Sequence, residues 1–204
     1  YACCAGVHSA VDACLMLVQQ HGVFDAGAIA RIDSWTARRR LAHTNRPQPN
    51  SALDAKFSVQ YCVARALMHG KVLFEHFEGD AYRDPVVCQL LPRIHAAPFT
   101  EAQFPKENNN GAEIRVTMTD GRTLSAKVER ALGRTTENPI PAAQLRTKFE
   151  DCAVRVLKPE VAAKVANLIE SFETVDTLRD FTALLEPDSG IARATLRELK
   201  RGSA

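Results

Sequence analysis

Apolar residues recur at helical spacing near the start of the chain. They are Val7, Val11, Cys14, Leu15 and Val18. With Gly22 as a stop signal, this series predicts a helix over about 8–20. Residues 28–36 then alternate imperfectly between apolar and polar, which predicts a strand. The segment from Arg40 to Asn50 carries two prolines, so we expect a loop there and no helix.

The strongest periodic segment lies over residues 51–70. Its apolar face comprises Leu53, Phe57, Tyr61, Ala64 and Met68. Ser51 and Asp54 form a capping-box pattern at its start, and Gly70 provides a C-terminal stop. The pattern therefore predicts one long amphipathic helix.

The clearest strand signal comes later in the chain. Apolar residues alternate with polar ones first at Ile114, Val116 and Met118, and again at Leu124, Ala126 and Val128. Asp120-Gly121 between them is a two-residue turn, so the segment predicts a β-hairpin. Upstream of it, the sequence predicts a short helix over 84–91 and a strand over 93–98.

The composition changes at Asn138-Pro139-Ile140-Pro141, which we interpret as a boundary. Beyond it, three apolar series each mark one helix: Leu145/Phe149/Cys152, Val161/Val165/Leu168/Phe172 and Val175/Leu178/Phe181/Leu185. The predicted fold class is α+β. A small antiparallel sheet with helices packed on it is expected over residues 1–137, and an all-helical segment over 138–204.

Composition and charge exclude several kinds of partner. The chain has 204 residues, of which 46% are hydrophobic and 25% charged, as in ordinary globular proteins. No apolar run approaches the roughly 20 residues of a membrane span, so no membrane partner is expected. A net charge of +2 is too small to indicate a nucleic acid. The basic run Arg38–Arg40, continued by His43 and Arg46, is either a solvated strand end or an electropositive rim for a small polycarboxylate.

The six cysteines do not form a metal motif. No Cys-x-x-Cys pair exists, and the vicinal Cys3 and Cys4 have poor chelating geometry. Cys14 and Cys62 fall on apolar helix faces, so we predict reduced structural thiols and a cytoplasmic location. Three histidines lack a cysteine or carboxylate at ligand spacing: His69, His76 and His95. We therefore expect no metal site.

Candidate chemistry concentrates in the loop Ala42-His43-Thr44-Asn45-Arg46-Pro47. The imidazole of His43 titrates near neutrality, and Asn45 and Arg46 can hold an anionic substrate beside it. The guanidinium of Arg46 matches a carboxylate bidentately, or it satisfies loop carbonyls in a structural role. His43 is alternatively an ordinary surface histidine.

Three further residues are candidates. His8 stands at the start of the first helix, where it either faces a cleft or bonds to the backbone. Tyr61 lies on the predicted long helix and belongs either to its core face or to a binding site. Lys56 lies on the same helix and is either solvated or a substrate ligand.

Taken together, Tyr1-Ala-Cys-Cys-Ala-Gly-Val-His8, the His43 loop with the helix after it, Asn138-Pro-Ile-Pro and Lys148-Phe149 resemble the C-terminal half of the MmgE/PrpD family. That family includes 2-methylcitrate dehydratase, cis-aconitate decarboxylase and iminodisuccinate epimerase. The resemblance runs in order over about residues 1–185. Family members are about twice as long, so we expect this chain to be a fragment that is inactive alone.

The resemblance implies a division of labour. In the family, the α+β part is a lid over the active site, and the tail helices pack on an N-terminal helical domain, which is the expected missing partner here. It also implies a homodimer and a cofactor-free enzyme. A family histidine falls in the segment from Cys4 to His8, and a family lysine precedes the position of Tyr1. The decarboxylase branch has a tyrosine where this chain has His43, which argues against assigning that activity directly.

The resemblance implies a lyase or isomerase that acts beside a carboxylate. Removing a proton next to a carboxylate needs a base and a positive clamp. We expect His43 and His8 to be catalytic, and Arg46, Asn45, Tyr61 and Lys56 to bind substrate. A 2-methylcitrate-like dehydration ranks first, and an epimerisation of iminodisuccinate type is the alternative. A non-catalytic oligomerisation module is the competing class.

Overall fold

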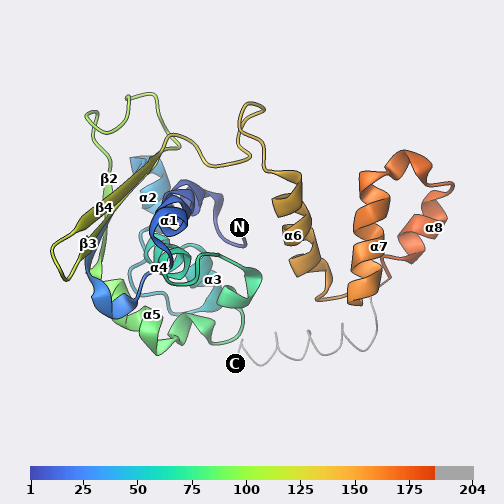
Figure 1. The fold of residues 1–204 in the computed structure, drawn as a ribbon, viewed down its shortest axis with the longest axis horizontal. Coiled ribbons are helices and arrows are strands. Elements are labelled where there is room, and N and C mark those ends of the chain that lie inside the picture. Colours follow the sequence, from blue (N-terminus) through green and yellow to red (C-terminus); the bar gives the residue numbers. More distant parts are fainter. Residues whose placement is uncertain (187–204) are drawn as a thin grey trace. The chain divides into compact units, whose positions relative to one another are not determined.

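A computed structural model describes residues 1–186 of the chain, and the end of the predicted helical segment, 187–204, lies outside the described residues. The chain divides into two compact units, Tyr1–Pro139 and Ile140–Ala204. Figure 1 shows the first as helices packed beside a sheet and the second as helices only. The predicted α+β class, with a helical segment after the sheet, is confirmed.

The first unit contains a four-stranded sheet. Its strands are β1 (Ile29–Thr36), β2 (Ile94–Pro98), β3 (Ala112–Met118) and β4 (Thr123–Val128), in the order β2-β1-β3-β4. The pairs β1–β3 and β3–β4 are antiparallel as expected, whereas β1 and β2 are parallel. The sheet is therefore mixed, because the chain returns from β1 to β2 through a helical crossover, which delivers a parallel neighbour.

The predicted hairpin is confirmed as β3–β4. Val116 pairs with Leu124, and the N–H of Met118 donates to the carbonyl of Arg122 at 2.8 Å across the turn. Gly121 has φ of 88°, a conformation that glycine adopts without steric cost. The alternation of the sequence thus places one face of the hairpin on the core.

Five helices of the first unit cover or flank the sheet. They are α1 (His8–His21), α2 (Arg38–Thr44), α3 (Ala52–Lys56), α4 (Val59–His69) and α5 (Pro85–Leu90). The core lies where α1 and α4 pack with β1 and β3, and its largest fully buried side chains include Tyr61, Leu17, Ile29, Ile32, Leu67, Leu90 and Ile114. Short 3₁₀ turns connect α4 to α5 at Phe74–Phe77 and Ala81–Arg83.

Two predictions about helices were wrong. The expected loop over 40–50 begins with helical residues, because α2 continues to Thr44 and the prolines come only after its end. The single helix over 51–70 is instead two helices, α3 and α4, separated at Phe57 and Ser58. Ser58 is extended, and its hydroxyl accepts the N–H of Tyr61 as the N-cap of α4.

The second unit is made of α6 (Ala142–Ala153), α7 (Pro159–Glu170) and α8 (Leu178–Ala183). Its small core comprises Ala153, Leu157, Ala162 and Val165, against which Phe149, Val161, Phe181 and Leu184 pack. Several large apolar side chains of this unit stay exposed, among them Leu145, Ile169, Phe172 and Leu178.

Candidate functional site

The predicted catalytic loop leaves the end of α2 with its side chains outward. His43 lies in the last turn of α2, and Asn45 and Arg46 are the first two residues after this helix. All three are exposed, whereas Thr44 between them is fully buried. The buried Thr44 anchors the segment, so the three polar side chains share one stretch of surface.

Side chains at the start of α4 hold this loop by hydrogen bonds. The hydroxyl of Ser58 donates to the carbonyl of Arg46 at 2.6 Å, and the N–H of Arg46 donates to Oε1 of Gln60 at 3.2 Å. Nε2 of Gln60 in turn donates to Oδ1 of Asn45 at 2.7 Å. Both holding residues are buried, with Gln60 only 2% exposed. The loop conformation is therefore fixed by side chains of another helix.

Neither Ser58 nor Gln60 was singled out from the sequence. The available signal was a glutamine inside the otherwise apolar run Val59-Gln60-Tyr61-Cys62-Val63-Ala64. A buried polar side chain needs partners, so its position on a core-facing helix is itself an indication of a nearby polar segment.

The side chain of Arg46 bonds within the loop and to Asp54, and it is also partly exposed to solvent. Its Nε donates to the carbonyl of His43 at 3.3 Å, and its Nη1 pairs with the carboxylate of Asp54. The guanidinium also lies 5.3 Å from the ring centroid of Phe57. The side chain is 44% exposed, and no described residue accepts a bond from Nη2. Both expected roles of Arg46, structural and ligand-binding, are compatible with this position.

His8 lies at the first position of α1, half-buried in the N-terminal segment. Its Nε2 is 3.2 Å from the carbonyl oxygen of Cys3, and its ring meets that of Tyr1 edge-on at 5.2 Å. The hydroxyl of Tyr1 donates to Asp12, one helical turn further along α1. The geometry is that of the backbone-bonded alternative.

The N-terminal segment packs against α2 and α3. A Cβ atom on Gly6 would lie 3.2 Å from Cγ2 of Thr44, so only glycine fits without displacement. The N–H of Cys4 donates to the carbonyl of Lys56 at 2.8 Å. The structure therefore brings the segments that carry His8, His43 and Lys56 together. Within residues 1–186 it places no hydrogen bond between the two imidazoles.

The Cys3 thiol was not expected to be unusual. Hydrogen bonding to the Cys62 thiol, with a further contribution from His8, lowers the pKa of Cys3 to about 6 even though burial opposes ionisation. Burial raises the pKa of Cys62 well above its usual value. Cys14 and Cys62 are buried as predicted.

Tyr61 is buried, whereas Lys56 is half-buried with its ammonium group against an aromatic ring. Tyr61 is fully buried, and its hydroxyl donates to the carbonyl of His76 at 2.5 Å, so the structure supports its core alternative. Burial raises the pKa of this phenol. Nζ of Lys56 lies 4.6 Å from the centroid of the Phe74 ring, a cation–π contact that occupies the ammonium group.

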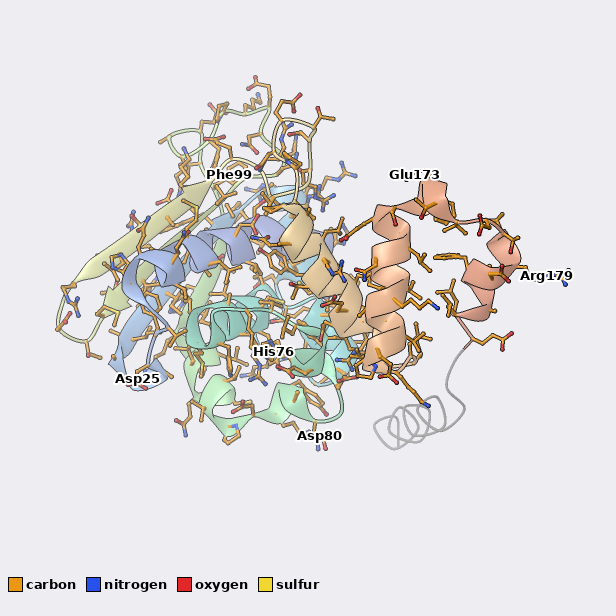
Figure 2. All side chains as sticks on the ribbon, turned by 45° about the vertical axis from the view of Figure 1, so that its right-hand side comes forward. Asp25, His76, Asp80, Phe99, Glu173 and Arg179 are labelled. Carbon is orange, nitrogen blue, oxygen red and sulfur yellow. The ribbon has the colours of Figure 1, made fainter. Side chains whose placement is uncertain are left out.

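A second polar cluster lies on the other side of Tyr61. Arg65 is 4% exposed and donates to the Tyr61 hydroxyl at 2.9 Å, to the carbonyl of Ala81 at 2.7 Å and to Asp84 at 2.9 Å. His76 lies inside the first unit, with its imidazole buried (Figure 2). Burial, reinforced by the charge of Arg65, lowers the pKa of His76 to about 4.

The described residues also bear on metal sites and membrane spans. Within residues 1–186, no group of three or more His, Cys, Asp or Glu side chains is placed to hold a metal ion. In the same part of the chain, none of the helices has the length and apolar character needed to cross a membrane.

Comparison with known proteins gives one family and several relatives. The sequence model described as the MmgE/PrpD C-terminal domain matches residues 1–174. Cis-aconitate decarboxylase of Mus musculus is 25% identical over 190 residues, which cover 83% of this chain and 38% of the mouse protein. Cis-aconitate decarboxylase of Aspergillus terreus is 24% identical over 197 residues, covering 91% of this chain and 39% of the fungal protein. The chain thus spans about two fifths of the length of these relatives.

Proposed function

The chain belongs to the MmgE/PrpD family, and from this premise we propose that it works as the C-terminal part of a lyase acting on a small polycarboxylate. The carrying observation is the loop held by Ser58 and Gln60, which presents His43 beside Asn45 and Arg46 on one exposed stretch. An imidazole next to an amide donor and a guanidinium supplies a proton carrier and a carboxylate clamp.

The proposed reaction is a dehydration of the 2-methylcitrate type. His43 removes the proton on the carbon next to a carboxylate, and Arg46 binds that carboxylate. The departing hydroxyl takes a proton from an acid, for which His8 is the candidate in this chain, and leaves as water. The proposal includes a homodimeric, cytoplasmic enzyme that needs no cofactor and is completed by an N-terminal helical domain.

Decarboxylation of cis-aconitate is the second candidate, because the curated relatives carry that name. It needs the same clamp, with the proton carrier now protonating the carbon that loses carbon dioxide. An epimerase of iminodisuccinate type uses the same two groups to remove and return a proton. A purely structural role as an oligomerisation module needs none of them.

One assay series tests these alternatives. The longer protein that contains this sequence and the 204-residue chain alone are incubated with 2-methylcitrate, cis-aconitate and iminodisuccinate, with and without EDTA, and products are identified by mass spectrometry. We expect turnover of 2-methylcitrate by the longer protein, unaffected by EDTA, and none by the chain alone, since a site shared between domains loses its positioning when one is absent. Turnover of none of the three would contradict the lyase proposal and favour the structural module.

A further inference from the structure

The amide of Asn45 has its orientation set from inside the protein. Oε1 of Gln60 faces the main-chain N–H of Arg46, which can only donate, so this side of Gln60 is its carbonyl oxygen. The opposite side is then the NH₂ group, which can also only donate. It faces Asn45 at 2.7 Å, so the Asn45 atom turned inward is Oδ1. The main-chain N–H of Arg46 thus determines the orientation of both side-chain amides, that of Gln60 and that of Asn45.

The outward end of Asn45 is therefore a pair of N–H donors. Asn45 is exposed, and no described residue accepts a bond from its Nδ2. Arg46 adds a 44% exposed guanidinium one residue later. Neutral donors next to a positive charge suit an anionic oxygen, because charge-assisted hydrogen bonds are stronger than neutral ones.

We propose that Gln60 is a positioning residue that makes this site selective for a carboxylate, by holding the Asn45 carboxamide with its NH₂ group outward. The inference rests on the proposed function for the location of the site, and it goes further by assigning the selectivity to a buried residue that does not touch substrate. If the amide turned over, Asn45 would present its carbonyl oxygen and repel the carboxylate.

The substitution Gln60→Glu reverses the amide with little change in volume. The new carboxylate still accepts from the N–H of Arg46, but it can no longer donate to Asn45, so the Asn45 amide rotates to donate inward. In the longer enzyme we expect KM for 2-methylcitrate to rise roughly 10- to 100-fold, as for a lost hydrogen bond to a charged group. We expect kcat to change by less than about threefold, because the proton carrier is untouched.

Gln20→Glu is the matched control, since it makes the same charge change at an exposed glutamine of α1. It should leave KM, kcat and the thermal melt unchanged. A folded Gln60→Glu protein with wild-type KM, or one that loses kcat at constant KM, would overturn the inference.

A direct measurement on the unaltered chain covers the case in which Gln60→Glu does not fold. In a ¹⁵N-labelled sample, the side-chain NH₂ signals of Asn45 should shift on titration with citrate and stay in place with trimethyl citrate, which lacks the charges. The NH₂ protons of Gln60 should exchange slowly with water, because the group is buried and bonded. Unshifted Asn45 signals, or shifts equal for both compounds, would contradict the inference.

The two measurements also separate this inference from the proposed function. Citrate-induced shifts at Asn45 without turnover of any polycarboxylate would leave the selectivity standing and remove the lyase. Turnover of 2-methylcitrate with an unchanged KM in Gln60→Glu would leave the lyase standing and remove the selectivity.

Discussion

Helix α4 and its N-cap residue Ser58 hold two irregular segments, and the two segments differ in which groups stay accessible. At its start, Ser58 and Gln60 bind mainly the backbone of the loop, through both the N–H and the carbonyl of Arg46. The only loop side chain engaged is Asn45, through its oxygen. The imidazole of His43 is exposed, and the guanidinium of Arg46 is 44% exposed beside its pair with Asp54.

Tyr61 and Arg65 of α4 hold the segment over 76–84 through the carbonyls of His76 and Ala81 and through the carboxylate of Asp84. The phenol and the guanidinium bond to each other, to the backbone and to Asp84. The difference teaches where to look for chemistry: both segments are held mainly through backbone groups, but the guanidinium of Arg46 is 44% exposed, whereas that of Arg65 is buried and paired with Asp84. Four predictions test this comparison, from the largest expected effect to the smallest.

His43 should be the most sensitive position of the loop. In the proposed longer enzyme we expect His43→Ala to lower kcat by roughly 10²- to 10⁴-fold, the usual contribution of a general acid or base. The melting temperature should not change, because the side chain is exposed. Steady-state kinetics beside a thermal melt measures both. His21→Ala, at another exposed histidine, is the control, and a folded His43→Ala protein with wild-type kcat would make His8 the better candidate.

Arg65 should matter for stability alone. Arg65→Met leaves the partly buried carboxylate of Asp84 without its partner, and we expect the free energy of unfolding to fall by about 3–5 kcal/mol. Chemical denaturation of the chain gives this value. The control is Arg83→Met, because the pair of Arg83 with Asp80 is exposed and should contribute at most about 1 kcal/mol. Equal losses in both variants would contradict a structural role for the Arg65 cluster.

His76 should make the same cluster sensitive to acid. Folded His76 stays neutral down to about pH 4, held there by burial and by the charges of Arg65, His69 and Lys71, against the opposite effect of Glu75. The unfolded imidazole takes up a proton near pH 6.5. The unfolded state therefore binds more protons between these values, and the free energy of unfolding should fall by about 3 kcal/mol as the pH drops from 6.5 to 4.

The variant His76→Asn isolates this contribution. Nδ1 of His76 accepts the N–H of Leu73 at 3.2 Å, and an asparagine oxygen takes the same place without titrating. Denaturation curves of both proteins at several pH values give the difference. Plotted against pH, the free energies of unfolding of the two proteins should diverge above about pH 4 and run parallel above about pH 6.5. Parallel pH dependences over the whole range would refute the assignment.

Arg46→Lys should give the smallest effect of the four. The ammonium keeps the charge but loses the planar geometry and the Nε bond to the carbonyl of His43. We expect KM to rise about tenfold with kcat almost unchanged, as for a loss of uniform binding. Arg39→Lys, at an exposed arginine of α2, is the control. A fall in kcat at constant KM would instead assign Arg46 to the transition state.

The sequence predicted the parts of the fold that depend on local periodicity. The alternation around Asp120-Gly121 identified the hairpin, and the apolar series after Val7 identified α1. It failed at Ser58, because a serine cap hidden in a continuous apolar periodicity looks the same as the middle of a helix. It failed again at α2. A loop was expected from Arg40 onward, but Pro47 lies beyond Thr44 and does not prevent the residues before it from being helical.

The residues of the candidate site likewise fall into those that local sequence indicated and those that it did not. His43, Asn45 and Arg46 stand within four positions, so their types and spacing indicated anion chemistry directly. Gln60 acts on them from another helix, and no local pattern records that contact. The Cys3 and Cys62 pair escaped for the same reason, since their interaction exists only in the folded chain.

The grip on Arg46 has a consequence for how this site can diverge. Ser58 and Gln60 hold the peptide groups of Arg46, and every amino acid except proline carries both the N–H and the carbonyl that they need. The exposed side chain of His43 takes no part in these bonds, so the residue at position 43 can be exchanged without changing the path of the chain. Because Ser58 and Gln60 hold the loop whatever residue stands at position 43, a single substitution there can replace a phenol by an imidazole. A new reaction can then arise while the loop keeps its conformation.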